Sequence, residues 1–153
     1  MWEKWHDKMW SMIVFLSSFP WFFLMITLYG FLVRSWTIIV IFLFSIGLLL
    51  CIQVLIKYFF PVLRPAGYKK TDLLSPTILD SSFPSHHTAC SFLLYFFAQA
   101  TIPQFWTLFL FFAVLVALSR IYFHKHYPID IAGGFVMAYV VFTVAMYIFG
   151  ILN

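Results

Sequence analysis

Cationic and histidine side chains gather in three short stretches of a chain that is otherwise strongly apolar. In chain order, these stretches are Lys57 with Arg64-Pro65, Pro84-Ser-His-His87, and Ser119-Arg120 with His126 and Asp130. Cations that meet at one site need an anion to neutralise them, and the planar fork of arginine matches phosphate oxygens while lysine adds a compact charge. A helix beginning after Pro84 would add unpaired main-chain N–H groups and the positive end of its dipole. These features together predict a cradle for a phosphoryl group.

Two histidines of this set suit nucleophilic and acid catalysis. A carboxylate bonded to one imidazole nitrogen fixes the tautomer and makes the other nitrogen more nucleophilic, and Asp130 can do this for His126 from the first turn of the next helix. His87 suits the general acid for the leaving oxygen, because imidazole titrates near neutral pH. The predicted reaction is in-line attack on phosphorus, giving a phosphohistidine that water then hydrolyses. We expect no metal or other cofactor, since the cations stabilise the equatorial oxygens.

The composition indicates an integral membrane protein of the all-α class. Hydrophobic residues make up 64% and charged residues 9% of the chain, and the mean hydropathy is +1.00, whereas a soluble domain is about one quarter charged. The 153 residues predict one domain, 1–153. The net charge of +4 indicates an anionic partner or anionic membrane lipids, and the basic residues form no run that would suit nucleic acid. Cys51 and Cys90 lie in apolar runs and are expected to be packing residues.

Apolar runs predict a helical bundle with about five to six transmembrane helices, since about 20 apolar residues suffice to cross a bilayer. The runs are 21–33, 38–60, 85–100, 105–118 and 128–150. Residues 2–18 place tryptophans and charges at helical spacing, which predicts an amphipathic interfacial helix. Pro20 leaves open whether 21–33 is a short span or the second half of a bent one. The long polar segment 61–84 is expected to be a functional loop.

Threading these spans through a membrane places 57–64, 84–87 and 120–130 at one face, while the opposite face retains Arg34 and little other charge. All the unusual chemistry is therefore expected at one end of the bundle. Gly133-Gly134 is expected to allow close helix approach.

Other polar residues have simpler interpretations. His6 and His124 fall outside the motif spacing and are expected to be anchoring or hydrogen-bonding residues. Lys69 and Lys70 are expected to be solvated or to contact lipid headgroups.

The pattern Lys-x6-Arg-Pro, Pro-Ser-x-His and Ser-Arg-x5-His-x3-Asp resembles, in order and spacing, the motifs of the type 2 phosphatidic acid phosphatase family (PAP2). The resemblance covers residues 57–130 and implies a metal-independent phosphatase. It implies that the phosphate is held, through side chains or main-chain amides, by Lys57, Arg64, Ser85, His86 and Arg120. It also implies His126 as nucleophile, Asp130 as its orienting carboxylate and His87 as acid. The family usually has glycine where this chain has His86, so an extra imidazole can touch the substrate there.

A site at headgroup level between spans indicates an amphiphilic substrate with a terminal phosphate. The family resemblance favours a polyprenyl diphosphate such as undecaprenyl diphosphate, and lipid A 1-phosphate, phosphatidylglycerol phosphate and phosphatidic acid are further candidates. Two alternatives remain open: a lipid phosphotransferase, which would use the same residues, and a transporter for anions or lipid headgroups, which would need polar residues near the bilayer midplane. The expected location is a bacterial cytoplasmic membrane. The positive-inside rule would place the motif face in the cytoplasm, but the resemblance indicates the extracytoplasmic face, which we favour.

Overall fold

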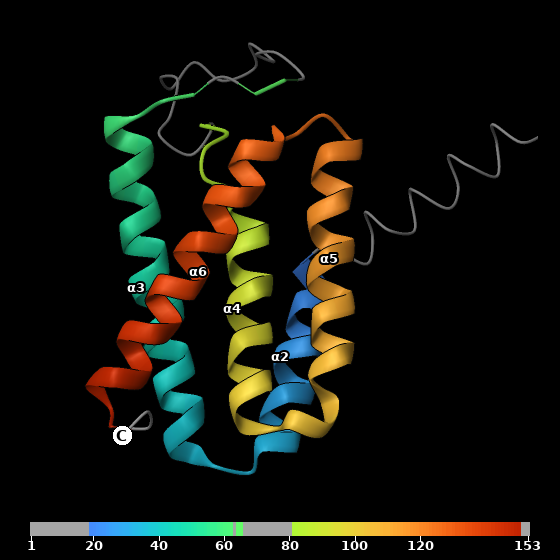
Figure 1. Ribbon diagram of the computed structural model, residues 1–153, viewed down its shortest axis with the longest axis vertical. Coiled ribbons are helices and arrows are strands. Elements are labelled where there is room, and N and C mark those ends of the chain that lie inside the picture. Colours follow the sequence, from blue (N-terminus) through green and yellow to red (C-terminus); the bar gives the residue numbers. More distant parts are fainter. Residues whose placement is uncertain (1–18, 63, 66–80, 151–153) are drawn as a thin grey trace, which may run out of the picture.

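The computed structural model describes residues 19–62, 64–65 and 81–150, and within them the chain is all-helical (Figure 1). The described α-helices are α2 (Phe19–Val33), α3 (Trp36–Phe59), α4 (His86–Thr101), α5 (Trp106–Tyr122) and α6 (Pro128–Ile148), with a short 3₁₀ helix η2 (Pro103–Phe105) before α5. The all-α prediction is confirmed. The expected interfacial helix at 2–18 and most of the expected loop at 61–84 lie outside the described residues.

Proline and a left-handed residue set several helix boundaries. Arg34 has a φ of 52° and forms the turn between α2 and α3. Pro103 and Pro128 occupy first-turn positions of η2 and α6, where the missing N–H of proline leaves no helical acceptor unpaired. Helix α3, the segment Pro103–Tyr122 and helix α6, with 24, 20 and 21 residues, are long and apolar enough to cross a membrane. The protein is therefore an integral membrane protein.

Helix α4 is the centre of the bundle and contacts every other described α-helix. Its side chains Ala89, Leu93 and Phe97 are completely buried. Helix α6 packs closely against the start of α4, because a Cβ atom on Gly134 would lie 2.8 Å from the carbonyl oxygen of Ser85. The expectation of close helix approach is confirmed for Gly134, whereas Gly133 lies against the ring of Phe83, which precedes α4.

Helix α3 buries one stripe of side chains spaced four residues apart, as expected for a single helix face. The stripe contains Ile41, Ser45, Leu49, Gln53 and Lys57. It is apolar or weakly polar over its first turns and strongly polar at its end. On this face of α3, strongly polar side chains therefore appear only near the C-terminus of the helix.

The helices alternate in direction, so that α3 and α5 end, and α4 and α6 begin, at the same end of the bundle (Figure 1). The prediction that the three polar stretches share one face is confirmed for their described residues. Helix α5 continues to Tyr122, beyond the expected boundary at 118. In this extra turn the polar side chains are not solvated: Ser119 Oγ donates to the carbonyl of Val116 at 2.6 Å, and Arg120 is buried.

Helix α4 also starts deeper in the bundle than the levels at which α3 and α5 end (Figure 1). Its 16 residues rise roughly 24 Å, less than the ~30 Å hydrocarbon core of a bilayer. The N-terminus of α4 therefore lies below the level at which the longer helices α3 and α5 end (Figure 1).

Candidate active site

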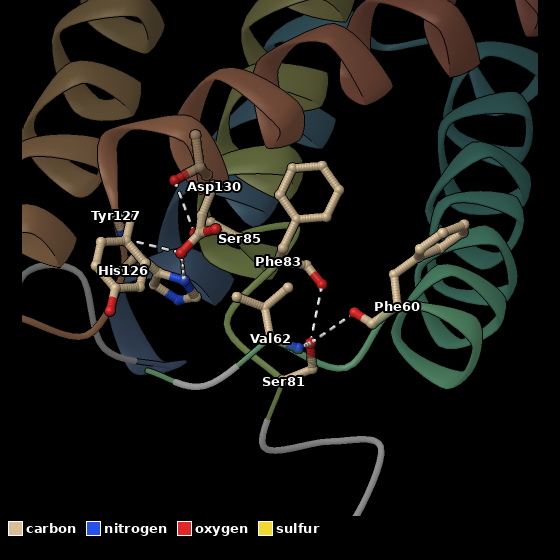
Figure 2. Close-up of polar contacts among 9 residues, drawn as sticks. Phe60, Val62, Ser81, Phe83, Ser85, His126, Tyr127 and Asp130 are labelled. Carbon is tan, nitrogen blue, oxygen red and sulfur yellow. Dashed lines mark hydrogen bonds and ion pairs between the residues drawn. The ribbon is translucent and has the colours of Figure 1, made fainter. Parts of the chain in front are cut away.

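The start of α6 holds a histidine and a carboxylate in contact. Asp130 Oδ2 accepts a hydrogen bond of 2.8 Å from the main-chain N–H of Tyr127 and lies 3.4 Å from Nδ1 of His126 (Figure 2). The two side chains are buried, with 6% of His126 and 1% of Asp130 exposed. The separation slightly exceeds an ordinary N–H···O distance, and catalytic contacts are often long before substrate binds. The carboxylate thus fixes the first turn of α6 and faces the imidazole at the same time.

The start of α4 is bonded directly to the start of α6. The main-chain N–H of Ser85, the N-cap residue of α4, donates to the carbonyl of Asp130 at 3.0 Å (Figure 2). The Ser85 hydroxyl makes no capping bond and instead accepts from Thr88 Oγ1 at 3.0 Å. Because the amide of Ser85 is committed to Asp130, the first-turn N–H groups at His86, His87 and Thr88 remain for an anion.

The segments that flank the long loop are paired where they enter the bundle. The N–H of Ser82 donates to the carbonyl of Val62 at 2.8 Å. The N–H of Val62 donates to Ser81 Oγ at 3.0 Å (Figure 2). Arg64 follows this pairing directly and is half-buried. These hydrogen bonds therefore hold the chain next to Arg64 close to the segment that leads into α4.

Three predicted phosphate-binding cations lie around this end of the bundle. Lys57, in the last turn of α3, and Arg120, in the last turn of α5, are buried. The charge of Arg64 acts on Arg120 and on His126. Such a concentration of positive charge in a half-buried setting favours a bound anion.

Lys125 is a further cation that the sequence interpretation left out of the site. Its N–H donates to the carbonyl of Arg120 at 3.0 Å. Burial and then the charges of Arg120 and Arg64 lower the pKa of its ammonium group. The sequence could have indicated Lys125 as a site residue, because it lies between Arg120 and His126 in the Ser-Arg-x5-His motif and cannot be far from either.

The surroundings of His126 favour its neutral form. Burial, and secondly the guanidinium of Arg64, lower its pKa well below the ordinary value of 6.5. Asp130 and the main chain of Ser82 act in the opposite direction but do not offset these two effects. The ring is therefore unprotonated at neutral pH, which is the form that can attack phosphorus.

His87 lies at the same end of the bundle as His126 and is exposed. Among its charged neighbours, Arg120 acts most strongly on its ring, and Lys125 and the rings of His86 and His126 also lie within electrostatic range. The two catalytic candidates are thus within electrostatic range of each other, with His87 on the accessible side.

His86 is bound to α3 by a residue that the sequence interpretation did not assign. Its Nδ1 lies 2.6 Å from Oε1 of Gln53, and its ring also contacts Sγ of Cys90. The charge of Lys57 acts on the same ring. Gln53 lies four residues before Lys57 on the same helix, so the two share a helix face. This spacing could have predicted that Gln53 belongs to the site.

All eight predicted site residues lie at one end of the bundle and are linked by the contacts and electrostatic interactions described above. They are Lys57, Arg64, Ser85, His86, His87, Arg120, His126 and Asp130. His124 is exposed in the turn after α5. Within the described ranges, no three His, Cys, Asp or Glu side chains gather closely enough to hold a metal ion.

A sequence model described as the PAP2 superfamily matches residues 38–153. The chain belongs to this superfamily. The PAP2 match includes every residue of the site and all of α4, α5 and α6.

Two known proteins are similar to this PAP2 chain. An undecaprenyl-diphosphatase from Sulfolobus acidocaldarius is 36% identical over 89 residues, which is 53% of this chain and 40% of that protein. A solved structure of a transmembrane PAP2-type phosphatidylglycerolphosphate phosphatase from Bacillus subtilis matches with a TM-score of 0.67 at 20% identity, over 97% of this chain and 79% of that one. The first match spans less than half of its relative's length, and the second shows a shared fold.

Proposed function

We propose that the protein is a membrane lipid phosphatase that works through a phosphohistidine. The observation that carries this proposal is the contact of His126 with Asp130 beside the amides at the start of α4 and the cations of α3 and α5. A neutral, oriented imidazole near several cations and the first-turn amides of α4 suits nucleophilic attack on a phosphate ester.

In the first step, Nε2 of His126 attacks phosphorus, and the bond from phosphorus to the leaving oxygen breaks. His87 donates a proton to that oxygen, while Lys57, Arg64 and Arg120 stabilise the charge on the equatorial oxygens. The N–H groups of the first turn of α4 support the same oxygens. Asp130 stabilises the positive charge that develops on the attacking ring.

In the second step, water attacks the phosphohistidine and gives its proton to His87. The phosphorus–nitrogen bond breaks, inorganic phosphate leaves, and His126 returns to its neutral form. No group beyond these side chains is needed to balance the reaction.

We infer a lipid substrate from the position of the site. The site lies at one end of a bundle that contains apolar, membrane-spanning helices, so a headgroup can bind there while its hydrocarbon stays among lipids. Both similar proteins are named for lipid phosphates, one a polyprenyl diphosphate and one a glycerophospholipid. We favour a polyprenyl diphosphate and keep phosphatidylglycerol phosphate, phosphatidic acid and lipid A 1-phosphate as further candidates. We place the protein in a bacterial cytoplasmic membrane with the site on its extracytoplasmic face.

The test is phosphate release from farnesyl diphosphate by the purified protein in detergent with a chelator present. His126→Ala should abolish release, and an acid-labile phosphoenzyme seen with the parent protein should disappear. His124→Ala is the matched control, because His124 lies in the same turn but is exposed and outside the motif. Full activity of His126→Ala would eliminate His126 as nucleophile, and loss of parent activity on chelation would contradict the proposed chemistry.

Adding a short-chain alcohol to the same assay separates hydrolysis from transfer. A phosphatase releases inorganic phosphate as its main product, whereas a phosphotransferase gives the alkyl phosphate at the expense of free phosphate. Folded protein that releases and transfers no phosphate would leave the transporter alternative.

A further inference from the structure

Gln53 and His86 form a buried polar pair that the reaction described above does not use. Gln53 is 3% exposed and sits on the interior stripe of α3, one turn before Lys57. Its Oε1 is 2.6 Å from Nδ1 of His86, the first residue of α4. A polar side chain in a membrane-spanning helix is costly and is normally retained for a function.

The amide nitrogen of Gln53 is the unexplained part of this pair. Among the described residues, Nε2 is buried and has no hydrogen-bond partner. A buried donor without an acceptor costs about 1–3 kcal/mol. Nε2 and Oε1 belong to one planar amide, so the unused donor lies beside the His86 ring. It is also on the same helix face as the ammonium of Lys57.

The contact with Oε1 determines what His86 can offer. Because Oε1 of Gln53 accepts at Nδ1, the proton lies on Nδ1 and Nε2 is the unprotonated nitrogen of the ring, 3.8 Å from Sγ of Cys90. The ring of His87, the proposed acid, is centred 5.7 Å away. The Gln53–His86–Lys57 cluster therefore lies beside the group that protonates the leaving oxygen, on the α3 side.

Resting on the proposed function, we propose that Gln53 and His86, beside Lys57, bind the leaving-group phosphate of a lipid diphosphate. The unused N–H donors of Gln53 would meet its oxygens, and a second anion beside His86 would favour protonation of that ring. The ring would then donate from Nε2. A monophosphate ester has no second phosphate to satisfy these donors, so the pair would discriminate between the two substrate classes.

The test compares farnesyl diphosphate with farnesyl monophosphate, because both carry the same hydrocarbon. Gln53→Leu removes both N–H donors and should lower the ratio of kcat/KM for diphosphate over monophosphate about tenfold, mainly through KM for the diphosphate. His86→Gly keeps the main-chain N–H but removes the ring, and should lower the same ratio. Ser45→Ala is the control, because Ser45 is buried on the same α3 face but bonds only within its helix.

The Gln53→Glu variant distinguishes binding of the diphosphate by Gln53 from a role in which Gln53 only holds the His86 ring in place. It keeps an oxygen that accepts from Nδ1 of His86 but replaces the donor with a negative charge. A supporting role predicts an unchanged ratio, whereas diphosphate recognition predicts a larger loss than in Gln53→Leu. An unchanged ratio in Gln53→Glu, or equal losses on both substrates in Gln53→Leu and His86→Gly, would overturn the inference. Failure of the parent protein to release phosphate from either substrate would instead count against the proposed function.

Discussion

The main-chain N–H of Ser85 donates a hydrogen bond of 3.0 Å to the carbonyl oxygen of Asp130. This bond joins the N-cap of α4 to the first turn of α6. The amides proposed to bind phosphate and the carboxylate proposed to orient the nucleophile are therefore parts of one rigid unit. A shift of either helix would move both halves of the site.

Gly134→Ala should disturb this unit. A Cβ at Gly134 would lie 2.8 Å from the main-chain oxygen of Ser85, and forced overpacking of this kind costs about 1–3 kcal/mol. We expect a lower thermal midpoint in detergent and a lower kcat, because Ser85 and Asp130 must separate. Gly47→Ala is the control, since no atom lies within 4 Å of a Cβ there, and alanine is the better helix former. Equal midpoints for the two variants would show that the α4–α6 contact yields without cost.

The Asp130→Asn variant should show whether Asp130 orients His126 for catalysis or only stabilises the first turn of α6. An amide oxygen can still accept the N–H of Tyr127, so the first turn of α6 is retained. The negative charge opposite His126 is lost, and removing the carboxylate of a comparable triad lowers kcat by several orders of magnitude. We expect at least a ~10²-fold fall in kcat with an unchanged thermal midpoint. Asp130→Ala should add a stability loss of about 1 kcal/mol, because the N–H of Tyr127 loses its acceptor. A kcat for Asp130→Asn near that of the parent would remove Asp130 from the mechanism.

The acid limit of activity should lie below the ordinary titration range of histidine. Burial and then the charge of Arg64 lower the pKa of His126. The neutral, attacking form therefore persists as the pH falls through 6.5, and kcat/KM should drop only at lower pH. Arg64→Gln removes one positive charge, which raises the pKa of His126 and moves the limit to higher pH. Arg64→Lys keeps the charge and should leave the limit in place. A limit that is the same in all three proteins would assign the titration to another group, such as the substrate phosphate.

The membrane orientation can be tested with cysteines at exposed positions of opposite ends. His124 lies at the site end and Arg34 in the turn between α2 and α3, and both are exposed. In a background lacking Cys51 and Cys90, His124→Cys should react with an impermeant thiol reagent on intact bacterial cells. Arg34→Cys should react only after the membrane is permeabilised. The reverse pattern would place the site in the cytoplasm.

The sequence was sufficient to predict most of the helices and the end at which the site lies. Long apolar runs, two of them preceded by Pro103 and Pro128, leave few alternatives in a bilayer, where main-chain groups must be bonded within helices. The α5 boundary was placed too early because Ser119 and Arg120 are polar. Polarity marks a loop only when the side chain is solvated, and here the helix turns Arg120 into the interior.

The contacts within the site could be predicted only in part. Sequence spacing alone predicts the contact of His126 with Asp130, because His126 lies just before α6 and Asp130 lies in the first turn of that helix. The bond from Ser85 to Asp130 and the pairing of Gln53 with His86 connect different helices. Whether these residues meet depends on how closely the helices pack and how they are aligned along their axes. Residues such as Gly134 determine this packing, and the motifs do not.

From the depth of the α4 N-terminus we expect bilayer thickness to affect the proposed reaction. A phosphate must descend past the ends of α3 and α5 before it meets the first turn of α4, while its hydrocarbon tail stays anchored in the surrounding leaflet. In a thick membrane this descent pulls the tail with it or dimples the lipid around the protein, at a cost of fractions of a kcal/mol per Å. In a thinner membrane the headgroup already rests near that level. With the same protein and the same substrate, turnover is therefore expected to rise as the acyl chains of the host lipids shorten.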